Sequence, residues 1–233
     1  MNYVIFGGSR GIGRAISEKL LHGGHSVWVV SRNAGDFSGA IHLEWDALTA
    51  VSGESGNEIV GLPEVIHGVV YAPGSITLKP FKGLKMADFQ HDLNVNFLGA
   101  VKALQSCLAG MKRAEKASVV LFSTVAVGTG MPFHASIAAA KGAVEGMVRS
   151  LAAEWAPQIR VNAIAPSLVH TDLSERLLSS LEKIEAAGKR HPLQRVGNAI
   201  DIANCACFLL DAENSWISGE VISVDGGMGK LKI

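Results

Sequence analysis

Short, nearly continuous apolar runs recur along the chain, separated by stretches with apolar residues at every third or fourth position. The runs predict strands at residues 2–6, 26–30, 40–44, 66–71, 117–123, 159–164 and 220–224. The spaced stretches predict helices at residues 11–22, 86–112, 134–156 and 199–210. Continuous runs such as Ser118 to Phe122 indicate strands that are buried on both faces. The pattern therefore predicts an α/β fold, a doubly wound parallel sheet of about seven strands with helices on both faces.

One long segment, at about residues 165–198, lacks this regular pattern. A helix is expected within it, around Ser174 to Ala187, and Pro166, Gly188, Pro192 and Gly197 interrupt its charged stretches. Such a segment is typical of a mobile flap over a cleft. Residues 1–233 are therefore expected to form a single domain with a substrate lid at about 167–195. At this length the core needs no disulfide or metal.

Composition narrows the range of partners. The 21 basic and 21 acidic residues cancel, which argues against a nucleic-acid partner. No apolar run reaches the roughly 18 residues of a membrane span, so no membrane association is expected. The apolar strand that follows Met1 does not resemble a leader, so export is not expected, and the three cysteines cannot all pair internally. These features favour a reducing, cytoplasmic location, and the spacing of the histidines predicts no metal site.

A glycine-rich turn, Gly7-Gly8-Ser9-Arg10-Gly11-Ile12-Gly13, joins the first strand to the first helix. Backbone N–H groups at a helix N-terminus and the helix dipole attract a pyrophosphate. Gly7 permits the tight turn, Gly11 lets the backbone approach phosphate, and Gly13 lets the helix pack on the strand. The turn thus predicts a dinucleotide-binding Rossmann domain. The expected contacts from the turn are Gly7, Ser9, Arg10, Gly11, Ile12 and Gly13.

The residues after the second strand indicate which of the two dinucleotides, NAD(H) or NADP(H), the chain binds. An NAD site usually offers a carboxylate to the adenosine ribose there, whereas this chain has Ser31-Arg32. Arg32 and Arg10 are suited to charge-assisted hydrogen bonds with a 2′-phosphate, which favours NADP(H). The alternative is two solvated arginines, with Asp36 reaching the ribose instead.

Five further motifs accompany the turn: Asp46 after the third strand, Tyr71-Ala72-Pro73-Gly74 after the fourth, Asn94-Val95-Asn96, Val161 to Pro166 with Thr171, and Gly219 to Gly227. Together they make the chain resemble, over essentially its whole length, the classical short-chain dehydrogenase/reductase family, especially the 3-oxoacyl-carrier-protein reductase type. The resemblance implies hydride transfer to a small-molecule carbonyl or activated enone, and a homodimer or homotetramer. It also implies further cofactor contacts from Asp46, Ala72, Gly74, Lys141, Pro166, Val169 and Thr171.

The chain departs from the family at the catalytic centre. The family places a serine, a tyrosine thirteen positions later, and a lysine four beyond that. Lys141 is present and Thr124 takes the serine position, but Ile137 stands where the tyrosine belongs. In the family the tyrosine protonates the developing alkoxide, the lysine lowers its pKa and holds the ribose, and the asparagine, here Asn96, anchors a relay water. Ile137 has no proton to donate.

Three explanations compete. His134, three residues before Ile137, could supply the proton if the helix already includes it, since it would then share that face. The adjacent Ser136 points about 100° away and is too weak an acid. Alternatively, the substrate may need no tyrosine, as with an enone protonated later by water. Finally, the chain may be a catalytically silent NADP(H)-binding protein, a sensor or the inactive partner of a related subunit.

Overall fold

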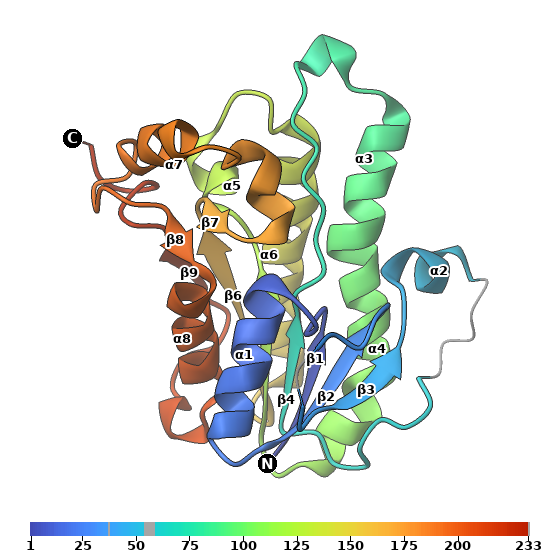
Figure 1. The fold of residues 1–233 in the computed structure, drawn as a ribbon. Helices are drawn as coiled ribbons and strands as arrows, with labels where there is room; N and C mark the ends of the chain where they lie inside the picture. Colours follow the sequence, from blue (N-terminus) through green and yellow to red (C-terminus); the bar gives the residue numbers. More distant parts are fainter. Residues whose placement is uncertain (37, 54–58, 233) are drawn as a thin grey trace.

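The computed structural model describes residues 1–36, 38–53 and 59–232. Within them a seven-stranded sheet lies at the centre of the molecule, between layers of helices (Figure 1). Its order is β3-β2-β1-β4-β5-β6-β9, and every neighbouring pair is parallel. The strands are β1 (Asn2–Phe6), β2 (Ser26–Ser31), β3 (Ile41–Glu44), β4 (Gly68–Tyr71), β5 (Ala117–Phe122), β6 (Ile159–Pro166) and β9 (Val221–Val224). This confirms the predicted doubly wound parallel sheet.

Helices cover both faces of the sheet and bury a separate core on each. On one face, α1 (Gly11–His22) packs beside α8 (Ala199–Leu210). Their apolar residues join Ile5, Val29 and Val120 in one core. On the other face lie α4 (Gly99–Arg113) and α6 (Ala135–Trp155), which share the second core with the alternate strand residues. The alternation of strand residues between two cores explains why the strands are apolar without interruption.

The predicted helix 86–112 is interrupted, which is a correction. It consists of α3 (Met86–Leu93), a π-helical turn (Asn94–Leu98) and α4. Gly99 N–H donates to the carbonyl of Asn94 instead of that of Val95, and the Val95 carbonyl accepts from Tyr71 Oη at 2.6 Å. A Cβ on Gly99 would lie 2.2 Å from Tyr71 Oη, so only glycine at position 99 leaves room for the Tyr71 hydroxyl. A residue from a neighbouring strand therefore sets the turn.

The prediction of a single helix around Ser174 to Ala187 is also wrong. A 3-10 helix (Asp172–Leu177) and α7 (Leu181–Gly188) replace it, and Ser180 caps α7 by accepting from Lys183 N at 3.3 Å. The ends of this segment pair as a small parallel sheet of β7 (Val169–His170) and β8 (Gly197–Asn198).

Four short helices were not predicted: α2 (Ala47–Ser52), α5 (Val125–Thr129) and two 3-10 turns (Phe81–Gly83 and Ala212–Asn214). Asp46 and Thr124 cap α2 and α5. Across the described residues, no helix combines the length and apolar character needed to cross a membrane.

Candidate cofactor and catalytic site

The predicted cofactor residues gather at the edge of the sheet where the parallel strands end. β1 lies between β2 and β4, so the strand order reverses beside the glycine turn, which is the usual crevice for a dinucleotide in such sheets. A Cβ on Gly7 would lie 2.9 Å from Pro73 N, and one on Gly11 would lie 3.6 Å from Thr171. The glycine turn therefore lies against the segments that follow β4 and β6.

The glycine turn itself has the backbone expected of a phosphate cradle. Gly7 has a φ of 71°, in the left-handed region. A Cβ on Gly13 would lie 2.3 Å from the Gly7 carbonyl oxygen, so the start of α1 must be glycine to approach β1. No side chain caps the N-terminus of α1, whereas α8 carries a capping box. The first turn of α1 is thus able to donate its N–H groups to a phosphate, and the residues present fit a dinucleotide.

The cationic candidates lie on the surface beside this turn. Arg10 is exposed at the N-cap of α1, and the side chain of Arg32 is 62% exposed after β2. Arg32 Nε lies 3.6 Å from Asp46 Oδ2, while Asp46 Oδ1 accepts from Leu48 N at 2.7 Å. The structure therefore brings the side chains of Arg32 and Asp46 together, beyond the ends of β2 and β3.

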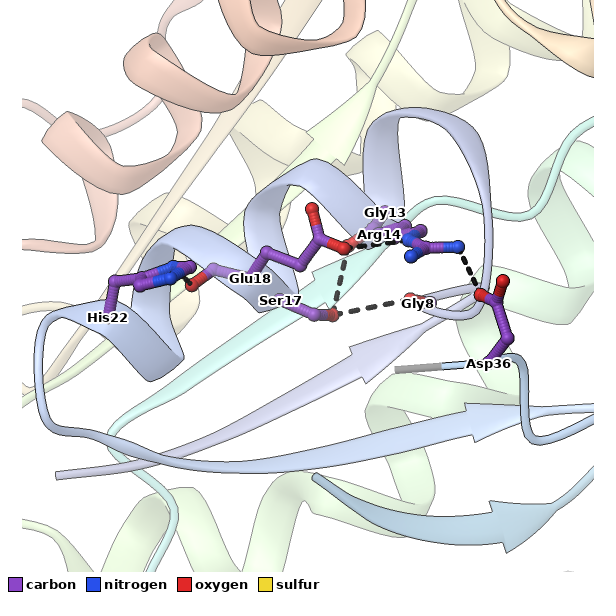
Figure 2. Close-up of polar contacts among 7 residues, drawn as sticks. All are labelled: Gly8, Gly13, Arg14, Ser17, Glu18, His22 and Asp36. Carbon is purple, nitrogen blue, oxygen red and sulfur yellow. Dashed lines mark hydrogen bonds and ion pairs between the residues drawn. The ribbon is translucent and has the colours of Figure 1, made fainter. Parts of the chain in front are cut away.

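Figure 2 shows that α1 also holds the loop after β2. Arg14 binds Asp36 of this loop and donates from Nε to Glu18 Oε1 at 2.7 Å. Ser17 Oγ, buried one turn further along, donates to the Gly13 carbonyl at 2.9 Å. Asp36, the alternative ribose ligand, is engaged by Arg14 in this arrangement.

The catalytic candidates converge at the start of α6. Ile137 and Lys141 lie one helical turn apart, both buried. Thr124, at the end of β5, is half-buried, and its Oγ1 accepts from Ala126 N at 3.3 Å. Asn96 is buried in the π-helical turn that packs against α6. A Cβ on Gly74 would lie 3.4 Å from Asn96 Oδ1, which places the asparagine beside the segment after β4.

Lys141 is the unusual group of this cluster. Burial lowers the pKa of its ammonium to about 8, and the negative charge of Asp92 acts in the opposite direction. In the described part of the chain, the Lys141 ammonium has no hydrogen-bond or ion-pair partner, so its charge is not neutralised by direct contact. An ammonium enclosed in this way is suited to donate hydrogen bonds to hydroxyl oxygens of a ligand.

His134, the alternative proton donor, and the tyrosine hydroxyl of Tyr71 lie in different surroundings. The helix α6 begins at Ala135, so His134 is its N-cap and lies outside the helical face on which it was expected to share a position with Ile137. Its Nδ1 is 2.7 Å from the Pro132 carbonyl. Tyr71 is buried, its hydroxyl is committed to Val95, and burial raises its pKa, so it is a structural group rather than an acid.

Sequence reasoning missed a buried polar network beside Asn96. Asp92 of α3 is fully buried and accepts from Ser75 Oγ at 2.7 Å and Thr77 Oγ1 at 3.1 Å. The signal was a carboxylate four residues before Asn96, on the same helical face. Ser167 and His191 were also missed as a pair: Ser167 Oγ is 2.9 Å from His191 Nε2. They line a cavity of about 210 Å³ behind residues 167–169.

The chain is similar to known proteins over nearly its whole length. Residues 7–229 match the family described as Enoyl-(Acyl carrier protein) reductase. The chain is 33% identical over 235 residues to a 3-oxoacyl-[acyl-carrier-protein] reductase of Bos taurus, covering 96% of both proteins. It is 30% identical over 229 residues to the 3-oxoacyl-[acyl-carrier-protein] reductase MabA of Mycobacterium bovis, covering 97% of this chain and 92% of MabA.

The fold is likewise similar to solved structures. The ligand-free aldohexose dehydrogenase AldT of Thermoplasma acidophilum superposes with a TM-score of 0.88 at 26% identity, covering 99% of this chain and 94% of that one.

Proposed function

Because the chain belongs to the classical short-chain dehydrogenase/reductase family, we propose that it is an NADP(H)-dependent oxidoreductase that reduces a carbonyl or activated enone. The observation that carries this proposal is the buried Lys141 on α6, the helix against which the π-helical turn of Asn96 packs, at the same edge of the sheet as the uncapped glycine turn. Bound there, the cofactor supplies hydride. The relatives named as 3-oxoacyl-[acyl-carrier-protein] reductases support an acyl-thioester ketone as one substrate class.

The glycine turn and its neighbours would hold the cofactor. N–H groups of Gly11, Ile12 and Gly13 face the pyrophosphate in this proposal, and Ser9 and Arg10 flank it. Arg32 contacts the 2′-phosphate, which is the basis for preferring NADP(H). The engagement of Asp36 by Arg14 supports this preference over the alternative in which Asp36 binds an unphosphorylated ribose.

The other end of the cofactor would lie between the segments after β4, β5 and β6. Ala72, Gly74, Pro166, Val169 and Thr171 form its walls, and Lys141 donates to ribose hydroxyls. Thr124 is positioned to hold the substrate oxygen, and Asn96 to anchor a water.

Proton supply distinguishes this site from the family pattern. With Ile137 in the tyrosine position, the residues of the site orient substrate and cofactor but provide no phenol. The proposal therefore needs another source for the proton. Either the substrate is an enone that takes its proton from water, or another side chain such as His134 donates it. The second candidate, a silent NADP(H)-binding protein, rests on the same observation of Ile137.

The experiment is consumption of NADPH and, separately, NADH in the presence of simple ketones, 3-oxoacyl thioesters and enones. Turnover of at least one substrate with NADPH, and its loss in Lys141→Met, is expected. NADPH binding without turnover of any substrate would favour the silent binding protein. Failure to bind either dinucleotide would exclude both candidates.

We also propose that the protein is a homo-oligomer and that it is located in the cytoplasm. Ile200 and Phe208 of α8, and Trp216 just beyond it, expose apolar side chains that an identical subunit would cover. Cys107, Cys205 and Cys207 are free thiols, as a reducing compartment maintains. Size-exclusion chromatography with light scattering tests the assembly.

A further inference from the structure

Asp92 is a buried carboxylate that neither the family pattern nor the site described above explains. It is 0% exposed, and its Oδ2 atom is buried without a hydrogen-bond partner in the described part of the chain. Both donors that reach it, Ser75 Oγ and Thr77 Oγ1, bind Oδ1. An enclosed carboxylate with an unsatisfied oxygen is costly, so its presence one helical turn before Asn96 requires a reason.

The first reason lies in the direction of the hydrogen bonds. An ionised carboxylate only accepts, so Ser75 donates its single hydroxyl proton to Asp92. Ser75 Oγ is then left to accept from Asn96 Nδ2, at 2.9 Å. The same amide nitrogen donates to the Asp92 backbone carbonyl at 2.8 Å, and Asn96 Oδ1 accepts from Ser75 N at 3.4 Å. Asp92 thereby fixes which way the Asn96 amide points.

The second reason is charge. The hydroxyl that the family places one turn before the lysine is replaced here by the hydrocarbon of Ile137. Lys141 therefore lacks that nearby oxygen, and the negative charge of Asp92, on the neighbouring helix α3, raises the pKa of Lys141 against the effect of burial.

The other ionisable groups on α6 near Lys141 and on the elements packed against α6 either bind other partners or are exposed. Glu145, one turn further along α6, accepts from Ser123 Oγ at 2.6 Å. On α3, Asp88 binds Lys79 at 2.7 Å and His91 is exposed. On β6, Arg160 donates to carbonyls of Ile217 and Asp211. The sequences of α5, β5 and the π-helical turn contain no ionisable side chain.

We infer that Asp92 is a positioning residue for the reaction proposed above: through Ser75 it orients Asn96, and from α3, which packs against α6, it places a negative charge toward the helix of Lys141, where the family's tyrosine hydroxyl is absent. The inference rests on the proposed function for its catalytic consequence only. Its electrostatic part concerns the protein alone.

The charge is tested without cofactor or substrate. Protein labelled with ¹³C at lysine Cε is titrated by NMR, and the Lys141 signal is assigned by its loss in Lys141→Met. Asp92→Asn should lower the Lys141 pKa by roughly one unit, as expected when an opposite charge nearby is removed. Asp88→Asn is the matched control, the same change one turn away on the same helix, and should leave that pKa unchanged. An unshifted Lys141 pKa in a folded Asp92→Asn variant would overturn the electrostatic role.

The orientation of Asn96 is tested by removing the Ser75 hydroxyl, which connects Asp92 to Asn96, while the charge of Asp92 is kept. Ser75→Ala keeps the Asp92 charge and should leave the Lys141 pKa unchanged, but it should lower kcat about tenfold for any substrate reduced, without raising the KM for NADPH. Ser75→Thr restores the hydroxyl and should restore kcat. Equal kcat in Ser75→Ala and the parent would overturn the orienting role.

A measurement on the unmutated protein covers the case in which Asp92→Asn does not fold. With ¹³C at aspartate Cγ, the Asp92 signal should show a step at the pH where Lys141 titrates, and absence of that step would also overturn the charge pairing. If the pKa shift is found and no substrate is reduced, the electrostatic role stands and the proposed function fails.

Discussion

The glycine turn and the start of α6 lie at the same edge of the sheet but are built from different material. The turn offers backbone N–H groups, and its side chains matter mainly where they must be absent, as at Gly7 and Gly13. The α6 site consists of buried ionisable and amide side chains, Lys141, Asp92 and Asn96. A backbone site is stable without its ligand, whereas buried charges oppose folding unless they are paired. The catalytic half is therefore where changes should have the largest effects.

The largest effect is expected from Ile137→Tyr. A phenol one turn before Lys141 would supply the missing general acid, so activity with simple ketones should appear or rise, by up to about 10² to 10⁴. Ile137 is only 4% exposed, and a larger ring must displace its neighbours, which reduces the gain. Steady-state turnover is measured beside NADPH affinity and thermal unfolding. No gain in a folded variant that binds NADPH would count against the proposed reductase.

The companion variant His134→Ala identifies the native proton donor. If His134 supplies the proton, this change should abolish the parent's activity. If water or the substrate supplies it, activity should be nearly unchanged, because the His134 side chain makes no capping hydrogen bond to α6.

The next effect is on the pH dependence of stability. Burial of the Lys141 ammonium lowers the free energy of unfolding while the lysine is charged. Its pKa of about 8 in the folded chain lies below the ordinary 10.5, so between these values the unfolded chain binds the extra proton. Stability therefore rises with pH through this window, and below pH 8 the penalty is complete. Relative to Lys141→Met, the parent should gain up to about 3 kcal/mol in free energy of unfolding between pH 7 and 11. Urea denaturation of both proteins measures it, and parallel pH profiles would contradict it.

A smaller effect is expected in the cofactor half. Arg32→Asp should weaken NADPH binding by about 10- to 100-fold, the value of hydrogen bonds to a charged group, and narrow or reverse the preference over NADH. Arg149→Asp, at an exposed position of α6, is the control for net charge. Calorimetric titration of both dinucleotides decides the point. Equal affinity of the parent for NADPH and NADH would remove the argument for the phosphate.

The smallest effect concerns the proposed lid. His191 joins α7 to the segment after β6, since its Nδ1 is 2.8 Å from the Ala187 carbonyl and its Nε2 is 2.9 Å from Ser167 Oγ. His191→Leu removes both bonds and should speed hydrogen exchange in α7 about fivefold, with α1 unchanged as an internal reference. NADPH should slow exchange across residues 167–195 of the parent. Equal exchange with and without NADPH would indicate a fixed wall instead of a lid.

The sequence alone determined the sheet, the helices α1 and α8, and the glycine turn, because strand and helix periods and the requirement for glycine are local properties of the chain. The resemblance to the family singled out Thr124, Lys141 and Asn96, and the structure carries them on elements that pack together around the start of α6. The order of the motifs carried the resemblance to the family.

Only the tertiary structure decided the features that depend on groups distant in the sequence. Tyr71 takes the carbonyl of Val95 and converts part of a predicted helix into a π-helical turn. Ser75 and Thr77 enclose Asp92, and Ser167 meets His191. No local period encodes these pairs. They arise because a buried polar group must find its partner wherever the packed elements bring one within reach.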